Sequence, residues 1–167
     1  SLHDALPIYA RRMDWKIKKE EVLCVPSVMF GISATIRALT KEQDSILISQ
    51  PVYYPFKEVI EDNDRVVVSN DLVLDENGKY RIDFEDFERK IRENHVHLFI
   101  LCSPHNPVGR VWTKEELGRI AEICFKYQVL VVSDEIHEDF VYEGYVHTPF
   151  LNAAPQMASS CITDAPI

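Results

Sequence analysis

Four short apolar runs alternate with helical patterns along the sequence, and this alternation leaves few folds open to the chain. The runs are short and partly β-branched, which is typical of strands that are buried on both faces of a sheet. Strands of this kind that are separated by helices predict right-handed crossovers and a mostly parallel sheet. We therefore expect an α/β domain whose strands include residues 46–49, 65–69, 97–102 and 129–133.

Helical patterns lie between and beside these runs. Thr113 and Glu116 have the spacing of a capping box, and the apolar residues after them recur at helical intervals. A helix is therefore predicted over residues 113–127. Further expected elements are helices over 30–39 and 84–92, and a hairpin over 75–80 around an Asn-Gly turn.

Composition limits the class of partner. The net charge of the 167 residues is −9, and lysine and arginine are scattered, so nucleic acid and anionic membranes are not expected as partners. The apolar runs are far too short to cross a bilayer. The cysteines are widely spaced without a CxxC pair, which predicts no metal site, no disulfide framework and a reducing cytoplasm. They are Cys24, Cys102, Cys124 and Cys161.

Chemically distinctive residues follow three of the apolar runs. Tyr53 comes after the first run, Asn106 after the third and Asp134 after the fourth. Open α/β sheets bind ligands beyond the carboxyl ends of their strands, so these side chains are expected at one edge. The segment VPSVMFG opens the helix expected at 30–39, where N–H groups and the helix dipole can hold a phosphate. A carboxylate, an amide, an aromatic ring and an anion site suit a phosphorylated nitrogen ring such as pyridoxal phosphate.

Each of these features also has an ordinary structural explanation. An aspartate after a strand is commonly a cap or a turn former, and Asn-Pro-x-Gly is a common turn. A tyrosine pair beside proline commonly serves packing, and VPSVMFG alone is only the start of a helix. Their joint order, with one feature at each strand end, is what favours a cofactor site.

The motifs SPHNPVGRVWTKEEL and VVSDEIHEDFVY give the chain a family resemblance over about residues 9–162. The sequence resembles the fold-type I pyridoxal-phosphate enzymes of the aminotransferase class I/II superfamily. Within that superfamily it is similar to the MalY/PatB-type cystathionine β-lyases. The resemblance implies a three-layer α/β/α large domain, a pyridoxal 5'-phosphate cofactor and a homodimer in the cytoplasm. It also implies a C–S β-lyase that cleaves cystathionine or cysteine S-conjugates to a thiol, pyruvate and ammonia.

The resemblance further implies cofactor contacts for particular residues. Asp134 would pair with the pyridinium nitrogen, Asn106 would hydrogen-bond the phenolic oxygen and Tyr53 would stack on the ring. His137 stands where transaminases have a tyrosine that contacts the same oxygen. The cofactor phosphate would be held by the backbone of Ser27, Val28 and Met29.

Other features of the two motifs concern the shape of the loops. By resemblance, cis peptide bonds are expected before Pro51 and Pro107, because a cis proline fixes a tight turn. His105, Arg110 and Trp112 are markers of the lyase branch, and we expect them to shape the loop.

The Schiff-base lysine of the family has no counterpart in the sequence. The last lysine is Lys126, which precedes Asp134, whereas the family places this lysine a few dozen residues after the aspartate. We therefore expect residues 9–160 to be a partial large domain that is inactive alone, without an N-terminal segment or the C-terminal small domain. Residues 1–8 are expected to be a non-native or disordered end, and 161–167 a truncated end.

Three other functions stay open at this point. One is an aminotransferase of the same fold, which shares the features named above and differs in its products. Another is a non-catalytic binding or regulatory module, which a missing lysine would suit. The third is a nucleotide-binding α/β domain, which the absence of a Gly-x-Gly-x-x-Gly motif and of a P-loop disfavours.

Overall fold

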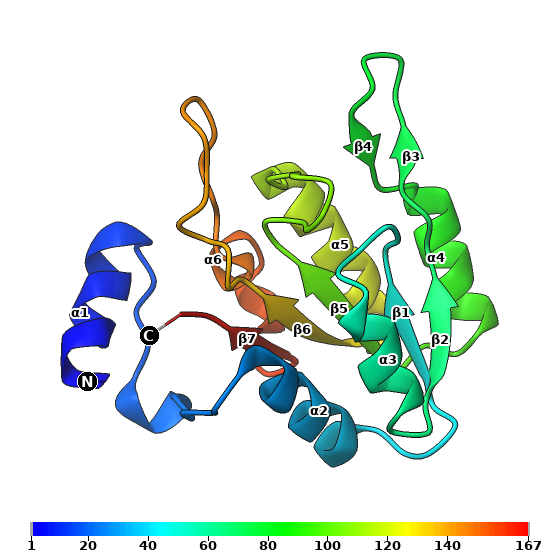
Figure 1. The fold of residues 1–167 in the computed structure, drawn as a ribbon, viewed down its shortest axis with the longest axis horizontal. Helices are drawn as coiled ribbons and strands as arrows, with labels where there is room; N and C mark the ends of the chain where they lie inside the picture. Colours follow the sequence, from blue (N-terminus) through cyan, green and yellow to red (C-terminus); the bar gives the residue numbers. More distant parts are fainter. Residues whose placement is uncertain (1, 167) are drawn as a thin grey trace.

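A five-stranded sheet forms the centre of the computed structural model, which describes residues 2–166 (Figure 1). All neighbouring strands pair in parallel, and the four predicted strands lie within about one residue of their expected bounds. The mostly parallel sheet is therefore confirmed. In spatial order the strands are β2 (Val66–Ser69), β1 (Ser45–Ile48), β5 (Leu98–Cys102), β6 (Leu130–Asp134) and β7 (Cys161–Asp164).

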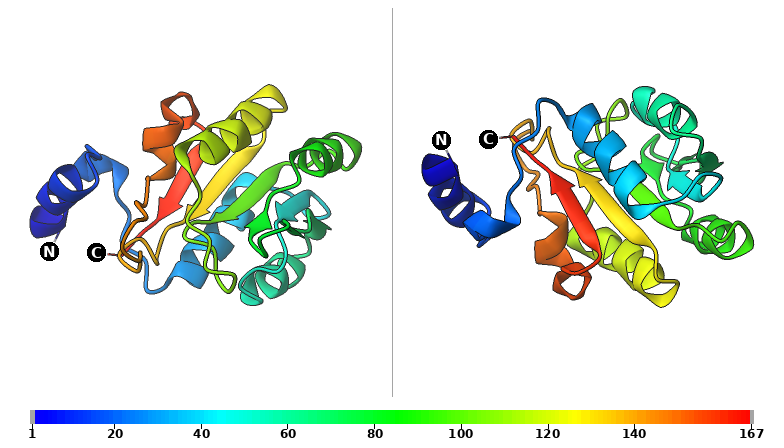
Figure 2. Two further views of the ribbon diagram at one scale, coloured as in Figure 1. Left: turned by 90° about the horizontal axis from the view of Figure 1, so that it is seen from above. Right: turned by 90° about the horizontal axis from the view of Figure 1, so that it is seen from below.

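Helices cover both faces of this sheet, as Figures 1 and 2 show. One face packs against α2 (Val28–Leu39) and α3 (Pro55–Glu61), which share a buried apolar cluster with β1, β5 and β6. The opposite cluster is larger, and its helices are α4 (Phe84–Glu93), α5 (Lys114–Lys126) and α6 (Phe150–Ala153). The expected three-layer α/β/α architecture is thus present.

The predicted start of α5 is confirmed in its details. The hydroxyl of Thr113 accepts the N–H of Glu116 at 3.2 Å, and the Glu116 carboxylate accepts the N–H of Thr113 at 2.8 Å. These bonds satisfy N–H groups that an open helix end leaves without partners. The apolar face of the helix then reaches the core through Leu117, Ile120 and Cys124.

Elements outside the sheet include the predicted hairpin. Its strands are β3 (Val73–Leu74) and β4 (Tyr80–Arg81), and Gly78 has the positive φ of 72° that its turn requires. The remaining elements are α1 (Leu2–Arg12), η1 (Lys19–Glu21) and η2 (Pro155–Met157). Among the described residues, no helix has the length and apolar content needed to cross a membrane.

Three peptide bonds before proline are cis. The bonds before Pro51 and Pro107 were expected, and the structure confirms both. The third, before Pro104, was not expected. All three lie in the loops that follow β1 and β5.

Candidate functional site

Asp134 is the last residue of β6 and lies at the carboxyl edge of the sheet. It pairs in register with Cys102 on β5 and with Asp164 on β7. Its side chain is 5% exposed, and one carboxylate oxygen accepts the N–H of Ile136 at 3.1 Å. The strand order therefore holds this carboxylate rigidly between two neighbours at the edge where α/β folds bind ligands.

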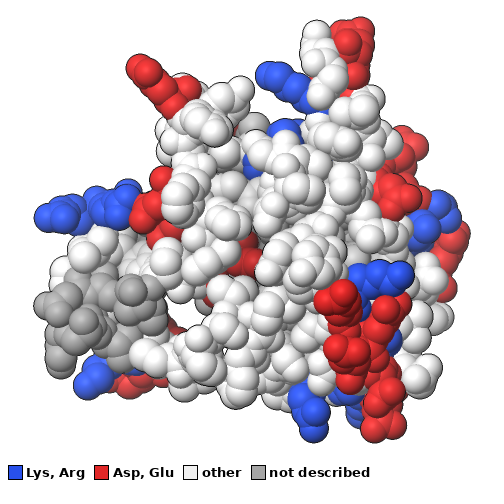
Figure 3. All heavy atoms as spheres, viewed as in Figure 1, with Lys and Arg blue, Asp and Glu red and all other residues white. Residues whose placement is uncertain are grey.

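The environment of Asp134 suits a cationic partner. Burial raises the pKa of Asp134 to about 6, and Glu135 adds to the rise, while the Ile136 N–H and His137 act in the opposite direction. No lysine or arginine within residues 2–166 forms an ion pair with it. Figure 3 shows lysine and arginine mostly toward the margins of the visible face. Because a buried charge is costly without a partner, a protonated ring nitrogen would fit this carboxylate.

Asn106 is linked to the same edge through Cys102. The N–H of Asn106 donates to the Cys102 sulfur at 3.4 Å, and the thiol donates to the Pro104 carbonyl at 3.4 Å. Burial raises the pKa of Cys102 to about 12, so the thiol stays protonated and can keep this donor role. In the described structure the side chain of the half-buried Asn106 makes no hydrogen bond, so its amide oxygen and nitrogen are available to a ligand.

Tyr53 belongs to the loop after β1 and is 36% exposed. Its ring meets Phe56 edge-on with 5.8 Å between centroids and an interplanar angle of 88°. The neighbouring Tyr54 ring lies at 5.8 Å and is tilted by 54°. Packing of this kind holds one side of the Tyr53 ring and leaves surface on which a flat ligand can stack.

The predicted phosphate segment forms the start of α2. Ser27 is the N-cap, and its hydroxyl accepts the N–H of Phe30 at 3.2 Å. The N–H groups of the next residues, Val28 and Met29, have no partner within the helix, as is general for a first turn. This turn lies near Asp164, because a Cβ added at Gly31 would come within 2.7 Å of its Oδ1. The start of α2 therefore lies next to Asp164, which pairs with Asp134 across the sheet.

His137 lies three residues after Asp134, in the turn that follows β6. Its ring packs edge-on against Phe140, with 6.0 Å between centroids. It is among the groups that lower the pKa of Asp134. The seven predicted cofactor residues thus belong to segments that the sheet brings to one edge, and their roles stay predictions.

Sequence reasoning missed a buried polar cluster behind Asp134. Glu135 is fully buried, and one of its oxygens accepts the Ser133 hydroxyl at 2.8 Å and the Phe150 N–H at 2.9 Å. Its other oxygen lies 2.8 Å from Nε2 of His147. These bonds tie the segment before α6 to the end of β6. The only signal in the sequence was the glutamate that directly follows Asp134.

A pH dependence follows from the buried carboxyl groups. Burial raises the pKa to about 6 for Asp134, and to about 7 for Glu138 and for Asp164. Each group binds its proton more tightly when folded than when unfolded, so its ionisation costs stability as the pH rises from about 4 to 7. Asp134→Asn removes one such cost and keeps the acceptor for Ile136. In the cofactor-free protein we expect this variant to be roughly 1–3 kcal/mol more stable than wild type at pH 8.

The difference should shrink to below about 1 kcal/mol near pH 4, where Asp134 is protonated in the folded state and about half protonated in the unfolded state. Urea unfolding of both proteins at pH 4, 6 and 8 measures it. A difference that is the same at all three pH values would show that Asp134 carries no shifted pKa.

Comparison with known proteins assigns the chain to a family that is consistent with this fold and with the residues at the carboxyl edge of its sheet. It belongs to the family described as aminotransferase class I and II, which matches residues 5–162. The sequence is 42% identical to cystathionine β-lyase PatB of Bacillus subtilis (strain 168) over 154 residues, which are 92% of this chain and 40% of PatB. The predicted family is therefore confirmed. The chain spans between 32% and 42% of the length of the curated relatives that it matches.

Solved structures agree with this assignment. Cystalysin from Treponema denticola, which contains pyridoxal 5'-phosphate, matches with a TM-score of 0.94 and 34% identity, over 98% of this chain and 41% of that one. The pyridoxal-phosphate-bound C–S lyase from Staphylococcus hominis matches with a TM-score of 0.94 and 30% identity, over 98% of this chain and 42% of that one. The α/β sheet described here thus matches part of the large domain of fold-type I pyridoxal-phosphate enzymes.

Proposed function

We propose that the complete protein is a pyridoxal-phosphate-dependent C–S β-lyase that cleaves cystathionine or related cysteine S-conjugates to a thiol, pyruvate and ammonia. The observation that carries the proposal is Asp134, a buried carboxylate that no lysine or arginine of the described residues pairs with, at the same edge as Asn106 and Tyr53. The similarity to PatB and to two cofactor-containing structures supports both the cofactor and the lyase branch.

When bound, the cofactor supplies an electron sink for the negative charge that develops at the substrate α-carbon. Asp134 keeps the proton on the ring nitrogen, and its burial strengthens this ion pair because the local dielectric is low. The amide of Asn106 donates a hydrogen bond to the phenolic oxygen. Tyr53 fixes the plane of the ring by stacking.

The phosphate and the substrate involve other parts of the edge. Backbone N–H groups of Ser27, Val28 and Met29, together with the positive end of the α2 dipole, hold the phosphate. His137 lies beside Asp134 and is suited to contact the phenolic side of the ring.

In this proposal the base that removes the α-proton is the lysine that binds the cofactor covalently. The chain spans only part of the length of its relatives, so in this proposal the lysine that binds the cofactor covalently belongs to the remainder of the complete protein. We propose that this protein is a cytoplasmic homodimer, and that residues 1–167 alone have no lyase activity.

Product analysis of the complete protein tests the function. With cystathionine as substrate we expect a thiol, pyruvate and ammonia in equal amounts, with no need for a keto acid. Residues 1–167 alone serve as the control and should give none of these products. Amino transfer to a keto acid without thiol release would contradict the proposal and favour an aminotransferase, which the family description also covers. Failure to bind the cofactor would favour a non-catalytic module.

A further inference from the structure

His105 connects the loop that carries Asn106 to the loop that carries Tyr53. Its side chain is 2% exposed, and its Nε2 lies 3.0 Å from the carbonyl oxygen of Pro51. A carbonyl oxygen only accepts hydrogen bonds, so Nε2 carries the hydrogen. Burial lowers the pKa of His105 to about 4, which keeps the ring neutral and preserves this donor at physiological pH.

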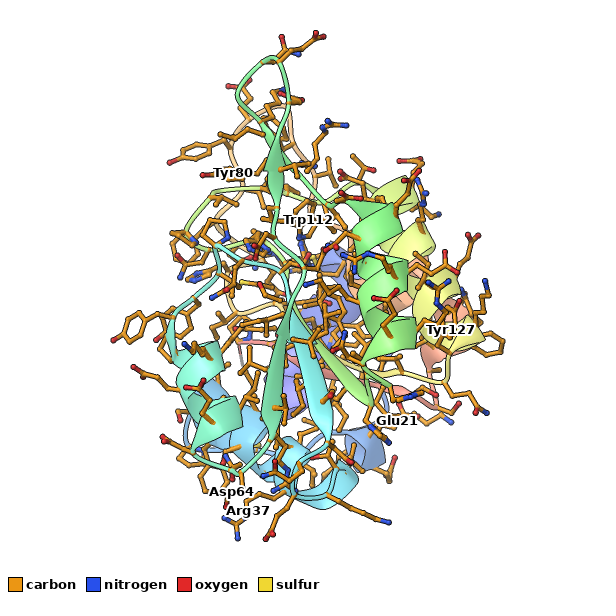
Figure 4. All side chains as sticks on the ribbon, turned by 90° about the vertical axis from the view of Figure 1, so that its right-hand side faces the viewer. Glu21, Arg37, Asp64, Tyr80, Trp112 and Tyr127 are labelled. Carbon is orange, nitrogen blue, oxygen red and sulfur yellow. The ribbon has the colours of Figure 1, made fainter. Side chains whose placement is uncertain are left out.

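The His105 ring also packs against a buried tryptophan. It packs edge-on against Trp112, with 5.3 Å between centroids and an interplanar angle of 83°. The indole is buried and donates to the carbonyl of Cys102 at 2.9 Å, at the end of β5. Figure 4 shows Trp112 in the interior of the molecule, on the side of the hairpin. The ring of His105 is thus fixed to the same strand end that orients Asn106.

Trp112 is held in turn by the start of α5. The guanidinium of Arg110 lies 4.5 Å from the centre of the indole and binds both carboxylate oxygens of Glu116, at 2.7 and 2.8 Å. Arg110 also donates to the carbonyl of Tyr80, which Figure 4 shows beyond Trp112 at the hairpin. Arg110, Trp112 and His105 therefore link the capping box of α5 to the loop of Tyr53 through successive contacts.

The backbone of His105 is fixed as well. Its N–H donates to the carbonyl of Arg110 at 2.7 Å, and its carbonyl accepts the N–H of Gly109 at 2.8 Å. Its Nδ1, in contrast, is buried and has no partner among the described residues. An unpaired buried nitrogen costs free energy, and a phenylalanine ring would avoid that cost. The polar ring at this position is therefore explained by the bond from Nε2 to Pro51.

We propose that His105 is a positioning residue, which sets the stacking ring of Tyr53 relative to the amide of Asn106. It precedes Asn106 directly in sequence and holds Pro51, two residues before Tyr53. This inference rests on the cofactor site of the proposed function and adds to it a residue that does not touch the cofactor.

A double-mutant cycle in the complete protein tests the inference. The probe is pyridoxamine 5'-phosphate, whose amine cannot form a covalent bond with a lysine, and its affinity is measured by calorimetry. We expect His105→Phe to weaken binding by about tenfold in the wild-type background, which equals roughly 1.4 kcal/mol. In a Tyr53→Ala background the same change should cost less than about twofold, because coupled residues are not additive.

Two further variants separate positioning from a general loss of structure. His105→Gln places an amide N–H within reach of Pro51, so we expect it to recover most of the affinity that His105→Phe loses. Tyr54→Ala is the matched control background, since Tyr54 is 72% exposed, and the tenfold effect of His105→Phe should persist there. If His105→Phe fails to fold, His105→Asn, whose shorter amide does not reach Pro51, takes its place in the cycle.

The possible outcomes are distinct. Equal losses in the wild-type and Tyr53→Ala backgrounds, or no loss in either, would overturn the inference and leave the cofactor site intact. A wild-type protein that does not bind the probe would overturn the proposed function, and the inference with it.

Discussion

Replacing Asp134 with asparagine in the complete protein is expected to lower the turnover of cystathionine by about a thousandfold or more, roughly 4 kcal/mol in transition-state free energy. The carboxylate is buried at the end of β6, and no lysine or arginine of the described residues pairs with it. In the proposed site, an amide at this position could not keep the ring nitrogen of the cofactor protonated, so the electron sink would be weakened. Steady-state pyruvate production by both proteins measures the effect.

Two controls bear on this result. Asparagine has almost the shape of aspartate and retains the acceptor for Ile136, so the fold should persist. Asp139→Asn changes a half-exposed carboxylate in the segment that follows Asp134, where it pairs with Arg12 of α1. This variant should leave turnover within about threefold of wild type. Turnover near the wild-type rate in Asp134→Asn would contradict the assigned role.

Replacing Glu135 with alanine is expected to lower the free energy of unfolding by about 3–5 kcal/mol. The change leaves the Phe150 N–H, the Ser133 hydroxyl and the Nε2–H of His147 without their acceptor in the interior. Buried donors that lose their partner carry the full cost of desolvation. Urea unfolding of the cofactor-free complete protein measures the loss, when it is monitored by a signal from the domain that contains this sheet.

Glu135→Gln is the matched comparison. Its carbonyl oxygen can still accept from Phe150 and Ser133, so we expect a smaller loss of about 1–2 kcal/mol, arising mainly at His147. If alanine and glutamine cost the same, or if alanine costs less than about 1 kcal/mol, Glu135 does not anchor the segment before α6 as described.

The central elements of the fold could be predicted because their signals are local. The apolar runs that became β1, β5 and β6 are buried on both faces, and such runs stand out in any sequence. The helix α5 begins at a capping box whose two residues are three positions apart. Neither signal depends on what the element packs against.

Elements with weak local signals were missed. The sequence predicts no strand at β7, because its residues are only partly buried and form no apolar run. The short helix α3 has only Phe56 and Ile60 in the core, too few for a periodic pattern. Both elements take their structure from tertiary contacts at the edge of the sheet and on its face.

Some features of the candidate site could likewise be predicted from the sequence, and others could not. Tyr53, Asn106 and Asp134 could be placed at one edge because each follows a predicted strand and parallel strands end on the same side. The partners of Cys102 and Glu135 could not be predicted, since they come from other strands and loops, and register across a sheet is not visible in the sequence. Their contacts nonetheless set the geometry of the predicted residues.

A crystal structure of the complete protein with bound pyridoxal 5'-phosphate would show whether Asp134 pairs with the cofactor ring. It should place the Asp134 carboxylate within about 3 Å of the ring nitrogen, with the Asn106 amide at the phenolic oxygen and the Tyr53 ring on the ring face. A cofactor bound at any other edge of the molecule, or a ring nitrogen that faces away from Asp134, would contradict the account.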